Sequence, residues 1–207
     1  MTVQILQSSA IILSGGLGKR FGFKEKGLLL FEGEQLIERK IRLLKEKFTE
    51  IIVVTNKPEL YEHLTNRILL IRDEESYCGP LMGIYSGLKA SKYNINFVCA
   101  VDMPFINYKL VDCLFEFTRN FEAVVAKVKG RLEPLFGFYS KQIIAKAKHI
   151  LKVNDRSNKS LRSLISCVDK KIVEETEVKC FDAELISFIN FNTCDDLASW
   201  RDNAKDD

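Results

Sequence analysis

The stretch A-I-I-L-S-G-G-L-G-K-R-F-G-F-K-E-K-G, residues 10–27, is unusually rich in glycine. An apolar run at residues 10–13 precedes the glycines and has the length and composition of a buried strand. Glycines that follow a strand let backbone N–H groups approach an anion closely, and Arg20 and Lys26 add fixed positive charge. The stretch therefore predicts a phosphate-binding loop at the end of a strand.

Two well-known phosphate loops do not fit this stretch. A dinucleotide-binding fingerprint requires G-x-G-x-x-G/A, but Phe21 occupies the place of the last glycine after Gly16 and Gly18. A Walker loop requires lysine directly after its second glycine, and Leu28 follows Gly27 instead. The loop therefore belongs to another class.

The pattern L-x-G-G-x-G-x-R-x-G at residues 13–22, followed by Lys26, resembles the signature loop of nucleotidyltransferases with a Rossmann-like fold. This group includes molybdenum cofactor guanylyltransferases, cytidylyltransferases and sugar-nucleotide pyrophosphorylases. An ordinary glycine-rich connection with solvated lysines is the alternative. It is disfavoured because the glycines, Arg20 and Lys26 all agree with the pattern at once.

Composition and charge limit the other classes of function. A length of 207 residues suits one α/β domain spanning 1–207, and the net charge of +3 does not indicate a nucleic-acid-binding protein. No apolar run approaches the roughly 20 residues that cross a membrane, and the first residues do not read as a signal peptide. None of the six cysteines forms a C-x-x-C pair, so we expect reduced thiols in a cytoplasmic protein rather than a zinc site or disulfides.

The hydrophobic pattern alternates between helices and strands in the first half of the chain. We expect helices at 35–48, 58–64 and 80–90, and strands at 51–55, 68–71 and 96–101. This alternation predicts an α/β fold with three layers and a Rossmann-like, mostly parallel, doubly wound sheet.

The second half is less regular. Strands are expected at 122–129, 135–139, 171–173 and 186–189, and helices at 140–151 and 159–167. Thr193 would cap a final short helix that opens at Asp195 and Asp196.

Polar residues follow several of these strands, where open α/β sheets place their ligands. Asn56 follows 51–55, Asp73 follows 68–71, and Asp102 follows 96–101. Gly79 and Pro80 open the helix at 80–90, and we expect them at the nucleotide. For Gly87, close packing explains the residue as well as a functional role does.

Four further segments extend the resemblance over nearly the whole chain. They are G-P-L-x-G at 79–83, D-M-P-F at 102–105, E-P-L at 133–135 and F-x-N-x-N-T at 188–193. Together they resemble the molybdenum cofactor guanylyltransferases, whose fold is of the nucleotide-diphospho-sugar transferase type. One departure is Phe136, because relatives often carry histidine after the P-L pair.

The resemblance implies transfer of GMP from GTP to the molybdenum–molybdopterin cofactor, with release of pyrophosphate. It assigns the nucleotide-binding and catalytic roles to residues of the N-terminal half, with Mg²⁺ as cofactor and Asp102 as its ligand. The implied nucleotide contacts are Leu13, Ser14, Gly15, Gly16, Arg20, Lys26, Asn56, Asp73, Gly79, Pro80 and Asp102, of which Arg20, Lys26 and Asp102 are catalytic.

The same resemblance implies that the C-terminal half binds the acceptor. Asn190 and Asn192 would face the molybdopterin, with Arg162 a further candidate. Transient contacts with proteins that deliver and receive the cofactor are expected, without nucleic acid or membrane. Two alternatives stay open: a nucleotidyltransferase of other specificity, such as a cytidylyltransferase for a pterin or a sugar or polyol phosphate, and a non-catalytic nucleotide-binding scaffold.

Overall fold

The computed structural model describes residues 4–15, 25–66, 68–75, 78–152 and 160–191, together with residues 196 and 200. Within these residues a seven-stranded sheet has the order β5-β4-β1-β6-β8-β7-β9. A two-stranded hairpin, β2-β3, stands apart from it. The strands of the main sheet are β1 (Leu6–Leu13), β4 (Phe48–Thr55), β5 (Leu69–Arg72), β6 (Ile95–Ala100), β7 (Ala123–Val128), β8 (Arg131–Ser140) and β9 (Lys170–Val173).

Most pairings in the sheet are parallel, which confirms the expected fold class. β1 pairs in parallel with β4 and β6, β4 with β5, and β7 with β9. β8 runs antiparallel to both of its neighbours, so it reverses direction within an otherwise parallel sheet. The reason is local, because β7 and β8 form a hairpin through Lys129 and Gly130, both of which have positive φ.

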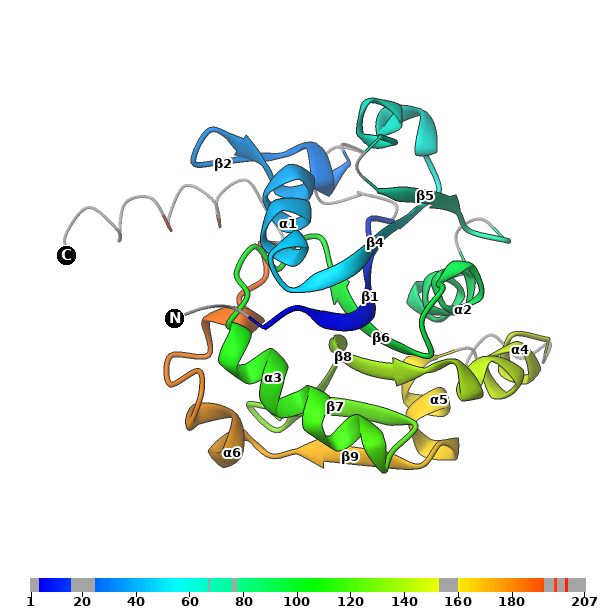
Figure 1. The fold of residues 1–207 in the computed structure, drawn as a ribbon, viewed down its shortest axis with the longest axis vertical. Coiled ribbons are helices and arrows are strands. Elements are labelled where there is room, and N and C mark those ends of the chain that lie inside the picture. The colour runs from blue at the N-terminus through cyan, green and yellow to red at the C-terminus, as the bar shows by residue number, and fades with distance from the viewer. Residues whose placement is uncertain are drawn as a thin grey trace.

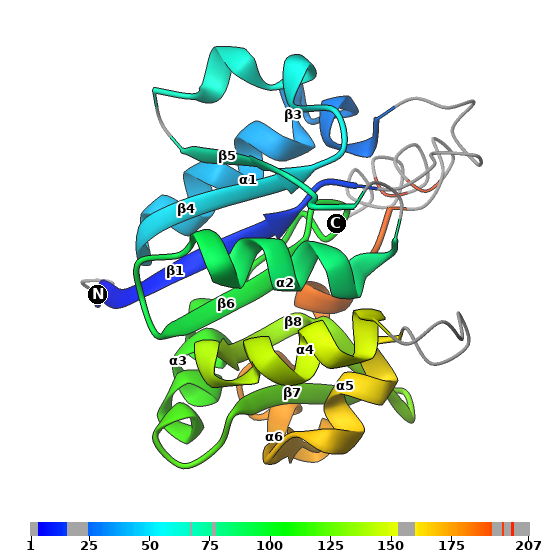
Figure 2. The same cartoon turned by 90° about the vertical axis from the view of Figure 1, so that its right-hand side faces the viewer.

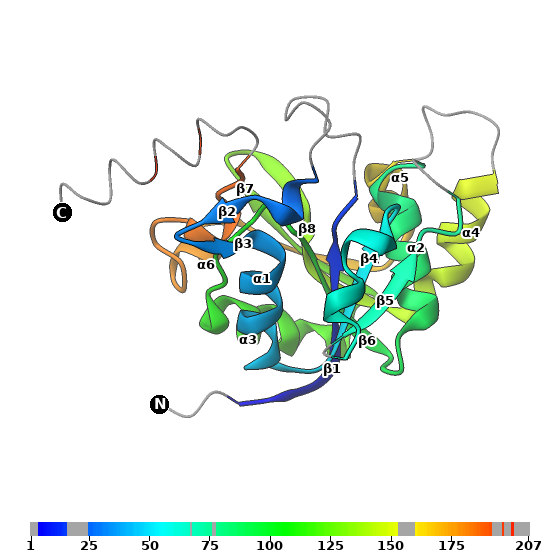
Figure 3. The same ribbon diagram turned by 90° about the horizontal axis from the view of Figure 1, so that it is seen from above.

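Helices cover both faces of the sheet, and Figure 1 and Figure 3 show the resulting three layers. One face carries α1 (Leu36–Lys45), α3 (Tyr108–Glu116), α6 (Glu175–Lys179) and the hairpin of β2 (Leu30–Phe31) and β3 (Glu34–Gln35). The other face carries α2 (Pro80–Ala90), α4 (Ile144–Lys152) and α5 (Leu161–Cys167). No helix of the described residues is long and apolar enough to span a bilayer.

Each face has its own hydrophobic core. The α1–α3 face is rich in aromatic rings, with Phe97 stacked on Phe48 at 5.4 Å between ring centroids. The α2 face is aliphatic around Ile11, Ile52 and Val98. Because adjacent strand residues point to opposite faces, the continuous apolar runs of β1, β4 and β6 supply both cores.

Two expected elements differ from the structure. The strand expected at 186–189 is wrong, since Ile186–Phe188 is a 3₁₀ helix. The buried carboxylate of Asp182 accepts hydrogen bonds from the backbone amides of Ile186 and Ser187, both at 3.0 Å, and this cap bends the segment out of an extended form. The helix expected at 58–64 is two short 3₁₀ helices, Pro58–Leu60 and Glu62–Leu64.

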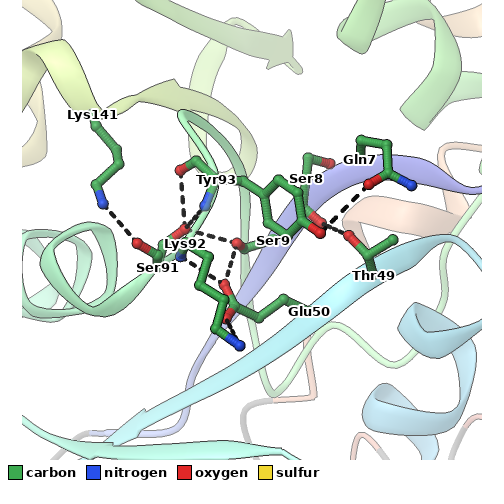
Figure 4. Close-up of polar contacts among 9 residues, drawn as sticks. All are labelled: Gln7, Ser8, Ser9, Thr49, Glu50, Ser91, Lys92, Tyr93 and Lys141. Atoms are coloured by element: carbon green, nitrogen blue, oxygen red, sulfur yellow. Dashed lines mark hydrogen bonds and ion pairs between the residues drawn. The ribbon is translucent and has the colours of Figure 1, made fainter.

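A buried polar cluster closes the amino-terminal edge of the parallel strands (Figure 4). Ser9 Oγ donates to Glu50 Oε2 at 2.6 Å and lies 2.7 Å from Ser91 Oγ. Lys141 Nζ donates to the Ser91 carbonyl oxygen at 2.6 Å. These contacts connect β1, β4, the end of α2 and the segment after β8, so the polar residues at this edge have a structural role.

The opposite edge is where β1, β4, β5 and β6 all end. In Figure 2 these carboxyl ends point to the right, the side on which the amino end of α2 also lies. Loops that leave a parallel sheet at this edge can bring residues far apart in sequence into one site.

Candidate active site

The carboxyl edge joins the glycine-rich region to the aspartate that follows β6. Lys26 Nζ lies 2.6 Å from Asp102 Oδ2, and the two residues are 76 positions apart in sequence. Their side chains are 30% and 16% exposed, so the pair is open to a ligand on one side. Two of the three residues expected to be catalytic therefore meet; Arg20 lies outside the described residues, as does Gly16.

Gly27 determines how closely Lys26 approaches the sheet. Lys26 begins the short 3₁₀ helix η2 (Lys26–Leu28), and Gly27 is buried in it. A Cβ at Gly27 would lie 2.6 Å from Tyr61 Oη and 2.9 Å from Ser14 Oγ, two oxygens that are themselves hydrogen-bonded at 2.9 Å. Only glycine allows η2 to sit this close to the end of β1.

Two backbone groups at the end of β1 form hydrogen bonds with neighbouring segments of the sheet. The Ser14 amide donates to the Val54 carbonyl oxygen at 2.9 Å, and the Leu13 carbonyl oxygen accepts from the Val101 amide at 3.1 Å. Gly15 is exposed, and a Cβ there would lie 3.4 Å from Asn56 Nδ2. The lack of a side chain at Gly15 thus leaves room in front of Asn56.

Asn56 and Asp73 form the second polar group at this edge. The Asn56 side chain is hydrogen-bonded to the Asp73 carboxylate and lowers its pKa, but burial has the larger effect and raises that pKa from 3.8 to about 6. Asp73 Oδ1 is buried and has no hydrogen-bond partner within the described parts of the chain. A buried acceptor without a partner is costly, so it is suited to a ligand that supplies an N–H group.

The amino end of α2 lies against the same carboxylate. Gly79 is the N-cap with φ of 84°, a conformation that favours glycine, and Pro80 occupies the first turn. A Cβ at Gly83 would lie 3.0 Å from Leu13 Cδ2 and 3.7 Å from Asp73 Oδ1. Close packing of α2 on β1 therefore places the Asp73 carboxylate against the first turns of α2 near Gly83.

Gly87 is explained by packing alone. A Cβ at this position would lie 2.6 Å from Ile11 Cγ2 and 3.2 Å from Val54 Cγ2. Both contacts are in the aliphatic core beneath the helix.

The residues expected at the acceptor are only partly connected to this site. The Phe191 amide donates to the Asp102 carbonyl oxygen at 2.9 Å, which brings the exposed Asn190 next to the turn that carries Asp102. Arg162 is exposed in the first turn of α5, on the face of the sheet that also carries α2 and α4 (Figure 3). Asn192 and Thr193 lie outside the described residues.

Phe136, which departs from the resemblance, lies in the core. It is fully buried, with its ring 5.0 Å from those of both Phe97 and Phe188. The register of β7 on β8 shifts here, from Val125 opposite Gly137 to Ala126 opposite Glu133. Pro134 cannot donate to a strand ladder and lies within this irregularity. An imidazole in the place of Phe136 would need its own polar partner in that core.

Comparison with known proteins agrees with the geometry of this edge. The model of the MobA-like NTP transferase domain matches residues 10–172. The chain belongs to the MobA-like NTP transferase family. A Methanosarcina mazei protein named "Probable molybdenum cofactor guanylyltransferase" is 36% identical to it, over 96% of this chain and 92% of that protein. A Clostridium perfringens protein of the same name is 34% identical, over 93% of this chain and 95% of that protein.

Solved structures show the same fold. Molybdopterin-guanine dinucleotide biosynthesis protein A from Archaeoglobus fulgidus superposes with a TM-score of 0.80 at 24% identity, and the match covers 96% of this chain and 100% of that one. At this identity the superposition speaks for the fold of the transferase and not for its specificity.

The donor set of this MobA-like transferase suits Mg²⁺. The Asp102 carboxylate, which contacts the Lys26 ammonium, is partly exposed at the sheet edge. Among the described residues no three His, Cys, Asp or Glu side chains gather into a metal-binding group. Mg²⁺ is commonly held by one or two carboxylates together with substrate phosphates and water, and a site built on Asp102 fits that pattern.

Sequence reasoning missed two residues of this site in the transferase. Tyr61 anchors Ser14 through its hydroxyl group, and burial raises its pKa to about 12. Lys40 is fully buried below the Asp102 turn, where its Nζ donates to the Met103 carbonyl oxygen. The signal for Lys40 was present, since a lysine falls on the apolar stripe of α1 formed by Leu36, Ile37, Ile41 and Leu44.

Proposed function

We propose that this MobA-like transferase catalyses guanylyl transfer from GTP to the molybdenum–molybdopterin cofactor. A terminal phosphate oxygen of the acceptor forms a bond to the α-phosphorus of GTP. The bond between the α-phosphorus and its bridging oxygen to the β-phosphate breaks, and pyrophosphate leaves with that electron pair. The product is the guanine dinucleotide form of the cofactor. The names of the relatives support this choice of acceptor.

The observation that carries the choice of base is the unpartnered Asp73 Oδ1. The Watson–Crick edge of guanine presents two adjacent donors, N1–H and the N2 amino group, and a carboxylate can accept from both. Cytosine presents only its N4 amino group as a donor on that edge. Asp73, with Asn56 on one side and the start of α2 on the other, therefore favours guanine over cytosine.

Charge neutralisation explains the proposed roles of the charged residues Lys26, Arg20 and Asp102. Both reactants are anions, and their repulsion must be offset before they approach in line. Lys26 would hold the phosphates of GTP and stabilise the charge that develops on the leaving pyrophosphate, with Arg20 assigned the same task. When bound by Asp102 and the phosphates, Mg²⁺ would act as a Lewis acid on the phosphate oxygens. No protein nucleophile is required, so positioning and electrostatics supply the rate.

The acceptor would enter from the side of Asn190. Support comes from the Phe191–Asp102 hydrogen bond, which places this segment beside the proposed reaction centre. The amide groups of Asn190 and Asn192 can donate to phosphate or pterin oxygens without adding charge. Arg162, in the first turn of α5, would add a cation for the acceptor. The C-terminal half would thus serve the acceptor, and delivering and receiving proteins would dock near it.

Pyrophosphate release tests the proposal directly. The purified protein, Mg²⁺ and the molybdenum–molybdopterin acceptor are mixed with each of the four NTPs in turn. We expect release only with the acceptor present, and with GTP strongly preferred. Preference for CTP would replace guanylyl by cytidylyl transfer, and tight nucleotide binding without any magnesium-dependent release would indicate a scaffold.

A further inference from the structure

Lys40 has an unusual position for a lysine. It lies in the middle of α1, and its neighbours on the same face of the helix are apolar core residues. Its side chain is fully buried, and Nζ donates to the Met103 carbonyl oxygen. Met103 directly follows Asp102, so α1 contacts the turn that carries the proposed metal ligand.

Stability does not account for a lysine at this position. Burial disfavours the ammonium form and lowers the pKa of Lys40, while the nearby Cys99 thiol and Asp102 carboxylate oppose that effect. An apolar side chain of similar length would fill the same space without the cost of desolvation. Both the ammonium and the neutral amine can donate to a carbonyl oxygen, so the hydrogen bond does not depend on the protonation state.

The turn after β6 is held from three directions. The Val101 amide donates to Leu13 in β1, the Asp102 carbonyl oxygen accepts from Phe191, and the Met103 carbonyl oxygen accepts from Lys40. The first two contacts are between backbone groups. The contact from Lys40 comes from a side chain, and it acts on the peptide next to the carboxylate.

We propose that Lys40 is a positioning residue for Asp102. By fixing the Met103 carbonyl it holds the 102–104 turn, and with it the direction in which the Asp102 carboxylate meets Lys26 and the cation of the bound nucleotide. The inference rests on the proposed function, since it concerns the metal and phosphate end of the same site. Lys40 itself touches neither nucleotide nor acceptor.

The chain offers a matched control in Lys47. Lys47 is also fully buried, but its Nζ lies 2.5 Å from Asp112 Oδ1. Lys47 directly precedes β4, so it lies at the edge of the sheet opposite to Asp102. Lys40→Met and Lys47→Met remove the same groups from two buried positions. A general effect of losing a buried lysine appears in both variants, whereas an effect on Asp102 appears only in the first.

The test measures Mn²⁺ binding to the protein–GTP complex by electron paramagnetic resonance, the melting temperature, and guanylyl transfer. For Lys40→Met we expect a melting temperature close to that of the wild type, because relief from burying the amine offsets the loss of the donor to the Met103 carbonyl oxygen. We expect Mn²⁺ binding at least fivefold weaker, and kcat at least tenfold lower with the KM for GTP within twofold. For Lys47→Met we expect Mn²⁺ affinity and kcat within twofold of the wild type.

Different results separate the two proposals. A wild-type protein that binds GTP but transfers nothing overturns the proposed function. An active wild type with a folded Lys40→Met variant of normal Mn²⁺ affinity and kcat overturns only the role of Lys40. If Lys40→Met does not fold, Lys40→Gln is measured in the same way. This variant keeps an N–H donor on a shorter side chain, so we expect a smaller loss of the same kind, and normal values would again refute the role.

Discussion

Lys26 Nζ contacts Asp102 Oδ2 at 2.6 Å, which connects the end of the glycine-rich region to the end of β6. The contact places a cation directly on the carboxylate that is proposed to hold Mg²⁺. A bound metal–nucleotide complex would replace this contact, because the phosphates offer Lys26 a partner while Asp102 turns to the metal. The pair therefore marks the proposed meeting point of phosphate and metal.

Asp102→Asn should leave the fold intact and nearly abolish turnover. An amide is a poor ligand for Mg²⁺, and losing the charge at the metal site should lower kcat by roughly 10²-fold or more. The ion pair is partly exposed, so its loss should change stability by less than about 1 kcal/mol. Circular dichroism and a magnesium titration of activity measure both effects. Near-normal turnover at moderate Mg²⁺ would remove Asp102 from the metal site.

Lys26→Ala should slow the chemical step more than it weakens GTP binding. Charge develops on the leaving pyrophosphate in the transition state, so the lost interaction should reduce kcat by about 10- to 1000-fold. Arg20→Ala should behave in the same way. Single-turnover rates at saturating GTP decide the matter. A rise in KM alone would mean that these residues only hold the ground-state phosphates.

Asp73→Asn should weaken GTP binding by about 10- to 100-fold and reduce the preference for guanine. Guanine donates to the ionised carboxylate, and burial raises the pKa of Asp73 to about 6. GTP affinity of the wild type should therefore be highest above pH 7 and should fall as the pH drops through 6, when the carboxylate takes up a proton. Calorimetric titrations between pH 5 and 8 test this. The affinity of the Asp73→Asn variant for GTP should not depend on pH in this range. If the variant shows the same pH profile as the wild type, another group causes the pH dependence.

Gly27→Ala should destabilise the protein by about 1–3 kcal/mol, because the new methyl group overlaps Tyr61 Oη and Ser14 Oγ. Removal of the hydroxyl in Tyr61→Phe creates space at the closest contact. We therefore expect the double variant to recover part of the loss in a urea-unfolding double-mutant cycle. Strict additivity of the two changes would show that the methyl group is accommodated elsewhere.

Asn190→Asp should impair transfer to the pterin while GTP affinity stays within about twofold of the wild type. The carboxylate would repel an anionic acceptor and lacks the donors of the amide, yet its size is nearly the same. Calorimetry with GTP is run beside the transfer assay. Equal loss in both, together with a lower melting temperature, would make Asn190 a structural residue of the segment after η8 (Ile186–Phe188).

The local pattern of the sequence was sufficient for most elements of the sheet. The apolar runs of β1, β4 and β6 form strands because they are buried on both faces, and the amphipathic α1 buries one stripe. Ser8 and Ser9 were not expected in a strand, yet both are fully buried. Ser9 is stabilised there by Glu50 and Ser91, partners that lie 41 and 82 residues away.

The sequence by itself therefore determined the family, the fold class and most of the candidate residues, since these depend on residue types at short spacings. Tertiary structure decided which residues meet: Lys26 with Asp102, Asn56 with Asp73, and Lys40 with Met103. It also decided that 186–188 is a helical turn, through the cap from Asp182. The physical reason is the same in each case: side chains far apart in sequence meet only where the packing of the elements brings them together, and most polar groups that the fold buries are then hydrogen-bonded.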